Sequence, residues 1–289
     1  LKEKAEWYIE VMSRMGVTTV EGKSGYGLDK TTELKQLEVM KAINEDPMRK
    51  VDIATTFLGA HAVPTEYKGR EDEYIDFLIE EMLPLIQEKG LAEHCDIFCE
   101  KGVFTVEQSR RLLQAAKDKG FGVKIHADEI VSFGGAELAG ELQALSADHL
   151  LHASDAGIQA MADNHVVATL LPLTAFTLRE PYARGREMID RGCAVALATD
   201  LNPGSCCSGS IPLTFALACI YMHFSVAEAI TAMTLNGAAA IGRANRIGSI
   251  EVGKQGDLVV LDADTPAILP YYTGMNAVRH TIKRGKIIY

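Results

Sequence analysis

The chain has 289 residues, 47% hydrophobic and 24% charged, which is the balance of an ordinary globular protein and excludes a disordered one. Its net charge of -10, without a cluster of lysines and arginines, argues against nucleic acid as a partner, because phosphate binding depends on grouped basic side chains. No apolar run reaches the roughly 18 residues of a membrane span, and the opening segment resembles an amphipathic helix rather than a signal peptide, so we expect no membrane contact and a cytoplasmic location.

Short β-branched runs alternate with helical patterns along most of the chain. The runs are VTTVE (17–21), VDIATTFLGA (51–60), DIFCE (96–100), GVKIHAD (122–128), ALSADH (144–149), VVATLLP (166–172) and AVALATD (194–200). The segments between them carry apolar residues at helical spacing, and several end at glycine, as helices commonly do. This alternation predicts an α/β fold built from β-α units around a parallel sheet.

Polar or turn residues follow nearly every one of these runs. In a (β/α)8 barrel the carboxyl ends of the strands form the active-site face, so their placement is typical of a barrel enzyme. A closed barrel needs eight parallel strands, whereas the sequence supplies seven runs with a helix before the first. We therefore expect a TIM-like barrel that lacks its first strand, within a functional protein longer than this chain.

The pattern changes after two predicted helices, at 210–222 and 225–241. GSIEVGKQGDLVVLDA is typical of a strand, a glycine turn and a second strand, and VRHTIKRGKIIY adds further short strands. We expect residues 1–245 to form the barrel and residues 246–289 to form the C-terminal portion of a small composite β-sandwich domain.

Two histidines and an aspartate stand at strand tips. KIHADE places His126 at such a tip with Glu129 just beyond it, while ALSADH and AVALATD end at His149 and Asp200. Because barrel strands converge on one axis, we expect His126, His149 and Asp200 to face one mouth. Imidazole and carboxylate are ligands that divalent metals such as zinc select, but a single histidine is often structural, so the residues alone leave both interpretations of His126 open.

Other chemistries have weaker support in the sequence. KSGYG has neither the G-x-S-x-G pattern of a serine nucleophile nor a phosphate-loop pattern. Its Gly25 and Gly27 permit close approach of the backbone, so Tyr26 either reaches into the mouth or packs in a turn. The adjacent Cys206 and Cys207 have no neighbouring base, and we assign them no catalytic role.

Several stretches that together span nearly the whole chain carry a family resemblance. They are TTVEGKSGYGL, TFLGAHAVP, DIFCEKGVFTVEQSRRLL, KIHADE, GGAELAGELQALSADHL, ALATDLNPGS and IGSIEVGKQGDLVVLDADTPAILPYYTGMNAV. This set resembles the imidazolonepropionases of the amidohydrolase superfamily, and the run from KSGYG through HAVP to DLNPGS is specific to them. The resemblance implies hydrolysis of imidazolone-5-propanoate, a product of histidine breakdown, to N-formimino-L-glutamate.

The resemblance also implies roles for individual residues. His126 and Asp200 match metal ligands on the fifth and eighth barrel strands, which hold one Zn²⁺ or iron ion. Glu129 matches a carboxylate that contacts the substrate ring, and His149 matches a histidine beside the reacting water. The positions that match residues holding the substrate or product are Tyr26, His61, Glu129, Asn202, Gly204 and Ser205.

The implied mechanism is attack of a metal-activated water on the ring carbonyl, with proton transfer to the departing ring nitrogen. Glu129, His149 and Asp200 are the candidate catalytic residues, and the sequence leaves open which of them moves the proton. The family's H-x-H ligand pair and its substrate-binding arginine do not occur here. We therefore expect this chain alone to be inactive.

Two alternative functions stay open at this point. The first is another cyclic-amide hydrolase or deaminase of the same superfamily, and the second is a catalytically dead, truncated binding module. A small-molecule substrate is the expected partner of the enzyme. A homodimer is expected only because dimers are the commonest assemblies of soluble enzymes.

Overall fold

The computed structural model describes residues 1–289, which divide into two compact units. The first unit consists of Leu1–Lys2, Val20–Arg49 and Ile53–Val166. The second consists of Glu3–Thr19, Lys50–Asp52 and Val167–Tyr289. None of the helices combines the length and the apolar character that crossing a bilayer requires. The predicted boundary near residue 245 stays a prediction.

The first unit is built on five strands that follow one another in chain order. They are β1 (Thr19–Lys23), β2 (Asp52–Ala60), β3 (His94–Cys99), β4 (Gly122–Ala127) and β5 (Ser146–His149). The pairings from β2 to β5 are parallel, as the β-α alternation predicts. Every residue of β2 is buried, which explains why its sequence is a nearly continuous apolar run rather than an alternating one.

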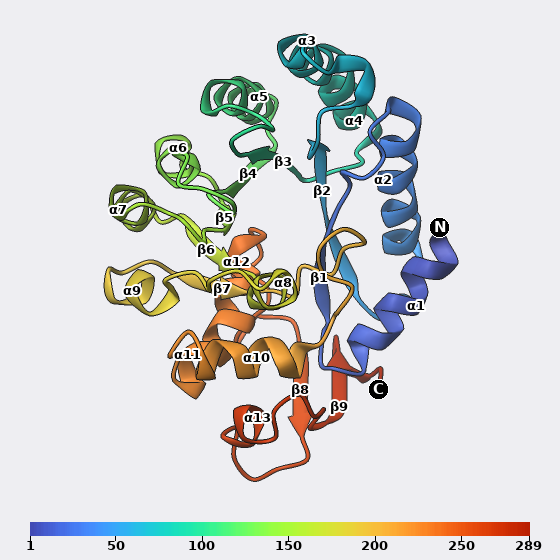
Figure 1. The fold of residues 1–289 in the computed structure, drawn as a ribbon. Helices are drawn as coiled ribbons and strands as arrows, with labels where there is room; N and C mark the ends of the chain where they lie inside the picture. Colours follow the sequence, from blue (N-terminus) through green and yellow to red (C-terminus); the bar gives the residue numbers. More distant parts are fainter. The chain divides into compact units, whose positions relative to one another are not determined.

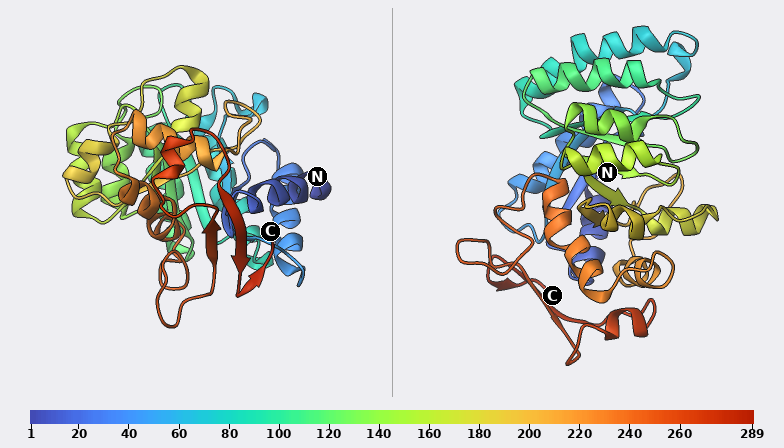
Figure 2. Two further views of the ribbon diagram at one scale, coloured as in Figure 1. Left: turned by 90° about the horizontal axis from the view of Figure 1, so that it is seen from below. Right: turned by 90° about the vertical axis from the view of Figure 1, so that its left-hand side faces the viewer.

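Helices of the first unit follow the strands in turn. They are α2 (Lys30–Glu45), α3 (Glu71–Phe77), α4 (Leu83–Lys89), α5 (Val106–Asp118), α6 (Gly135–Leu142) and α7 (Asp155–Asp163), with the short turns η1 (Thr65–Tyr67) and η2 (Leu78–Met82) between β2 and α4. Figures 1 and 2 show α5, α6 and α7 stacked on one side of β3, β4 and β5.

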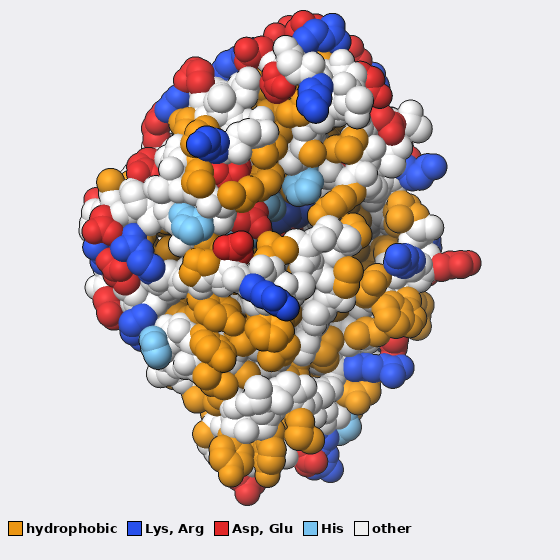
Figure 3. Space-filling model, in the orientation of Figure 1, with side chains coloured by type: hydrophobic (Ala, Val, Ile, Leu, Met, Phe, Trp, Pro, Cys, Tyr) orange, Lys and Arg blue, Asp and Glu red, His pale blue; other side chains and the backbone are white.

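On the face drawn in Figure 3, acidic and basic side chains are interspersed rather than separated by sign.

Local sequence explains where these helices begin. The Thr105 side chain accepts a hydrogen bond from the Gln108 amide, and the Gln108 side chain accepts one from the Thr105 amide, so the two residues form a capping box at the start of α5. Ser154 accepts a hydrogen bond from the Gly157 amide in the same way at the start of α7. These caps fix where each helix starts after its strand and therefore the length of the intervening loop.

The second unit continues the β-α alternation. It contains α1 (Lys2–Ser13), the parallel pair β6 (Val167–Leu170) and β7 (Val195–Leu197), and the helices α8 (Pro172–Leu178), α9 (Gly185–Asp190), α10 (Ile211–Ile220), α11 (Val226–Met233) and α12 (Leu235–Ala240). The seven predicted strand runs are therefore all present. Together with a small antiparallel sheet at the C-terminus, they confirm the predicted α/β fold of the amidohydrolase-barrel type.

The single helix predicted at 225–241 forms two helices in the structure. The pattern at 225–241 predicts a single helix, but the backbone leaves the helical region at Thr234, with φ -118° and ψ -87°. The Thr234 hydroxyl donates to the Ile230 carbonyl 2.7 Å away, a side-chain bond of the kind that bends helices. Apolar periodicity continued through the break, so the sequence pattern did not reveal it.

The C-terminal segment forms a small antiparallel sheet in the order β10-β9-β8, with β8 (Leu258–Leu261), β9 (Val278–Lys283) and β10 (Lys286–Ile287), and α13 (Ile268–Tyr271) between β8 and β9. β8 and β9 lie side by side in both views of Figure 2. The strand expected in SIEV is wrong, because Ser249, Glu251 and Lys254 bond to one another in a turn. Ile250 and Val252 are exposed there rather than paired.

Two carboxylates of the second unit, Asp257 and Asp52, hold the buried ammonium group of Lys283. The Lys283 side chain, at the end of β9, lies 2.7 Å from Asp257 and 3.0 Å from Asp52. Arg284 donates to both carboxylate oxygens of Asp52 at 2.6 Å. Lys283 is almost fully buried, so these contacts replace the water that its charge would otherwise hold.

We expect Lys283→Met to lower the free energy of unfolding by about 3 kcal/mol, because it leaves two largely buried carboxylates without their shared cation. Urea unfolding followed by circular dichroism measures the change. Lys286→Met, on the exposed β10, is the matched control and should change stability by less than about 0.5 kcal/mol. Equal effects of the two substitutions would contradict the importance of the buried pair.

Candidate active site

Charged side chains fill the interior of the first unit between its strands. Lys23, on β1, lies 2.6 Å from Asp96 of β3 and 3.0 Å from Asp148 of β5. It also lies 3.0 Å from Glu21, whose other oxygen is 3.1 Å from the fully buried Lys124 of β4. Alternate residues of a strand share a face, so Glu21 and Lys23 both point inward from β1. Two cations and three carboxylates thus form one buried network.

The same alternation places His126 within this network. The parallel register sets His126 of β4 opposite Asp148 of β5 and Phe98 of β3. Its Nδ1 lies 3.1 Å from Asp96 Oδ2. Burial alone would lower the pKa of His126, but the adjacent Asp96 carboxylate outweighs burial and raises the pKa to about 9. The same contacts, with Lys23, hold the pKa of Asp96 below its usual range despite burial.

Asp96, His126 and Asp148 offer donor atoms within 4.8 Å of one another, a set that could hold a metal ion. The Lys23 ammonium already lies against both carboxylates, so an ion placed among all three would have to displace it. His126 differs from the two aspartates, because its Nδ1 on Asp96 leaves Nε2 to bind a metal. Histidines that bind metals commonly give their other ring nitrogen to a carboxylate in this way. The geometry therefore fits His126 as a ligand and Asp96 as the group that orients it.

Glu129 and His149 lie next to this histidine. His149 Nδ1 is 3.5 Å from Glu129 Oε1, and the rings of His149 and His126 are 5.1 Å apart. His149 has φ +75° and Asp128 has φ +51°, a backbone region that non-glycine residues rarely adopt and that is concentrated at functional sites. The side chains of His126, Glu129 and His149 lie close enough together to act on one metal-bound water and its proton.

The loop that carries Glu129 is held by its neighbour in sequence. The buried carboxylate of Asp128 accepts hydrogen bonds from four successive amides, those of Phe133, Gly134, Gly135 and Ala136, at 2.6 to 3.3 Å. Burial raises the pKa of Asp128, although these four hydrogen bonds act in the opposite direction. They close the turn before α6 and fix the backbone beside Glu129.

Tyr26 and His61 form the remaining part of the site in the first unit. Their rings are 4.8 Å apart, and the His61 ring is 6.3 Å from that of His126 and stacked on Phe98 at 5.9 Å. Of the two interpretations of Tyr26, the structure favours the one in which it stands beside the other site residues. Tyr26, His61, His126, Glu129 and His149 are thus brought together.

The other predicted residues belong to the second unit. Asp200 follows β7 with φ +51°, and its Oδ2 accepts a hydrogen bond from the Thr174 hydroxyl at 2.7 Å. Asn202 Oδ1 accepts from the Gly204 and Ser205 amides at 2.8 and 2.7 Å, and Asn202 Nδ2 donates to the Asp200 carbonyl at 2.7 Å. Asn202 thus closes the turn after β7. That Asp200 and this turn join the site of the first unit stays a prediction.

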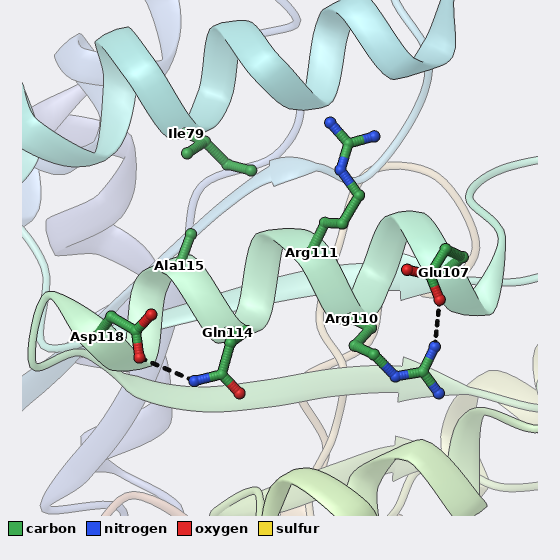
Figure 4. A pocket seen from close by; sticks show the side chains of 7 residues that line it. All are labelled: Ile79, Glu107, Arg110, Arg111, Gln114, Ala115 and Asp118. Atoms are coloured by element: carbon green, nitrogen blue, oxygen red, sulfur yellow. Dashed lines mark hydrogen bonds and ion pairs between the residues drawn. The ribbon is translucent and has the colours of Figure 1, made fainter.

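A separate hollow on the outside of the first unit carries no site chemistry. Figure 4 shows its lining, which comes from η2 and α5 and consists of Ile79, Glu107, Arg110, Arg111, Gln114, Ala115 and Asp118. Its arginines are already engaged: Arg110 pairs with Glu107 and Glu141, and Arg111 pairs with Asp72 at 3.0 Å. Both arginines of the hollow are therefore already paired with carboxylates.

The sequence reasoning missed Lys23, Asp96 and Asp148. A signal was present, because Asp96 and Asp148 are charged residues inside short strands whose other residues are almost all buried. A charged residue inside an apolar strand needs a partner of opposite charge. The sequence offered two candidate partners, Lys23 after one strand run and Lys124 inside another.

Comparison with known proteins identifies the family of the chain. The model of the amidohydrolase family matches residues 53–288. The imidazolonepropionase of Phocaeicola vulgatus is 80% identical over 289 residues, which is all of this chain and 70% of that protein. Those of Bacteroides thetaiotaomicron and Clostridium tetani are 74% and 62% identical, with 99% and 100% of this chain and 69% and 68% of those proteins covered.

Solved structures with low identity share the fold. A zinc-bound adenosine deaminase from Xanthomonas campestris superposes with a TM-score of 0.72 at 20% identity, covering 99% of this chain and 69% of the other. The ochratoxinase of A. niger superposes with a TM-score of 0.74 at 17% identity, covering 99% and 75%. These structures support the barrel architecture, and the sequence relatives narrow the family. The chain therefore belongs to the amidohydrolase family and, within it, to the imidazolonepropionases.

Proposed function

We propose that the chain carries the catalytic residues with which its protein hydrolyses imidazolone-5-propanoate to N-formimino-L-glutamate in histidine degradation. The observation that carries the proposal is the contact between Glu129 and His149 beside the ring of His126. It occurs in a chain that is 80% identical to a named imidazolonepropionase. That identity favours this reaction over other cyclic-amide hydrolyses or deaminations and over a role in binding alone.

His126 and Asp200 are the proposed metal ligands, for one Zn²⁺ or iron ion. Imidazole and carboxylate oxygen suit both metals, and an adenosine deaminase of the same fold holds zinc. When bound, the metal supplies Lewis-acid chemistry that makes water a nucleophile near neutral pH. Asp96 contributes by holding the His126 ring through Nδ1.

The chain's own residues account for the proton transfers. Water adds to the ring carbonyl carbon, the bond from this carbon to the ring nitrogen breaks, and that nitrogen gains a proton. In this proposal His149 orients the water and accepts its proton, and Glu129, whose Oε1 is 3.5 Å from His149 Nδ1, delivers a proton to the departing nitrogen. Asp200 remains the alternative proton carrier.

The proposed substrate contacts come from both units of the chain. Tyr26 and His61 would contact it from the first unit, and Asn202, Gly204 and Ser205 from the turn after β7. The tight turn that Asn202 closes presents the Gly204 and Ser205 backbone in a fixed conformation. A homodimer, a cytoplasmic location and the absence of nucleic-acid binding remain predictions.

In the protein that contains this chain, Glu129→Gln should lower turnover by about 10²- to 10⁴-fold, because the amide cannot transfer a proton although it keeps the shape of the carboxylate. Loss of the ultraviolet absorbance of imidazolone-5-propanoate measures turnover, and elemental analysis should find the metal content unchanged. Glu141→Gln, on the exposed side of α6, is the matched control. Full turnover in Glu129→Gln would remove Glu129 from the mechanism.

Asp96→Asn should weaken metal binding by about 10- to 100-fold, because an amide holds the His126 ring less firmly than a carboxylate does. Competition with a chelator of known affinity measures this change. Asp118→Asn, at the end of the surface helix α5, serves as the control for loss of one acidic group. Metal affinity equal to that of the unaltered protein would show that Asp96 does not orient the ligand.

A further inference from the structure

A buried carboxylate lies beneath the loop that carries Tyr26. Glu33, in the first turn of α2, is 1% exposed. Its two oxygens accept hydrogen bonds from the Gly25 amide at 3.0 and 3.1 Å, and Oε1 also accepts from the amides of Gly27 at 2.7 Å and Leu28 at 3.3 Å. One side chain thus satisfies three backbone donors of a loop that has no regular secondary structure.

The loop is shaped around this carboxylate. Gly25 has φ +121° and Leu28 has φ +57°, and amides in such turns can converge on one anion. A Cβ atom on Gly27 would lie 2.6 Å from both the backbone nitrogen and Oε1 of Glu33, so only glycine allows this approach. Without Glu33, the converging amides would lack a hydrogen-bond acceptor. Leaving buried donors unsatisfied would lower the free energy of unfolding.

The start of the loop is fastened separately to β2. The Ser24 amide donates to the Thr56 carbonyl at 3.1 Å, and the Ser24 hydroxyl accepts from the Leu58 amide at 3.0 Å. Tyr26 stands between this attachment and the Glu33 contacts, with 46% of its surface exposed and its ring against His61. The two attachments lie on either side of Tyr26 and therefore help to set the position of its backbone.

The loop after β4 is held by buried carboxylates in the same manner. Asp128 accepts from four amides that lead into α6, and Glu100 Oε2 accepts from the Ile130 amide at 2.8 Å. This loop carries Glu129. Two neighbouring groups of site residues are therefore placed by carboxylates that lie below the loops.

We infer that Glu33 is a positioning residue, which fixes the loop from Ser24 to Leu28 so that Tyr26 is held against His61 for substrate binding. The inference rests on the proposed function, because that function assigns Tyr26 to the substrate. Glu33 itself touches neither substrate nor metal. Its effect on the reaction is exerted through the backbone on either side of Tyr26.

The test compares Glu33→Gln, Tyr26→Ala and the double variant in the protein that contains this chain. The glutamine keeps the size of the side chain but turns an NH₂ group toward the amides, so we expect KM for imidazolone-5-propanoate to rise about tenfold and kcat to fall less than about threefold. Because both residues act on one interaction, the double variant should be no worse than the more damaged single variant. Bound metal should be unchanged.

Glu38→Gln is the matched control, because Glu38 lies on the same helix but is exposed and paired with Lys89 at 3.1 Å. An unchanged KM in Glu33→Gln, with KM raised in Tyr26→Ala, would overturn the inference and leave the proposed function intact. Effects that simply multiply in the double variant would also overturn it, since they indicate a structural role of Glu33 alone. An unchanged KM in Tyr26→Ala would instead refute the assignment of Tyr26 to the substrate, and the inference with it.

Discussion

The Lys23 ammonium, placed between Asp96 and Asp148, is the contact on which the interior of the first unit depends. Removing an ion from water costs several kcal/mol, and here the cost is offset because each charge meets an opposite charge within about 3 Å. Lys124 and Glu21 extend the same arrangement across β1 and β4. Burial would raise the pKa of Asp148, yet Lys23 and Lys124 hold it at about 2, so the carboxylate stays ionised.

This network links the core of the fold to its chemistry. Asp96 contacts both Lys23 and the Nδ1 of His126. The same carboxylate therefore balances a buried cation and lies against the ring of the proposed metal ligand. Above it, Glu33 and Asp128 hold the loops that carry Tyr26 and Glu129. Tyr26 and Glu129 stand on loops, and hydrogen bonds from the backbone of those loops to Glu33 and Asp128 restrain them. Such support allows loop residues to keep the fixed geometry that catalysis requires.

The fold of this chain is shared more widely than its family is. Structures of a deaminase and an ochratoxinase share the barrel at 17 to 20% identity, so the architecture alone is compatible with several hydrolytic reactions. An imidazolonepropionase that is 80% identical matches this chain over its whole length. The barrel alone does not set specificity, and the proposed roles of Tyr26 and Glu129 at the substrate stay predictions.

The sequence by itself determined the β-α alternation, the seven strands and the strand-tip positions of His126, His149 and Asp200, because apolar periodicity and turn residues are local properties. It also supplied the family through its motifs. Only the tertiary structure paired Lys23 with Asp96 and Asp148, since their contact joins residues more than 70 positions apart. The break at Thr234 and the absent strand at SIEV were likewise decided by hydrogen bonds that apolar patterning does not encode.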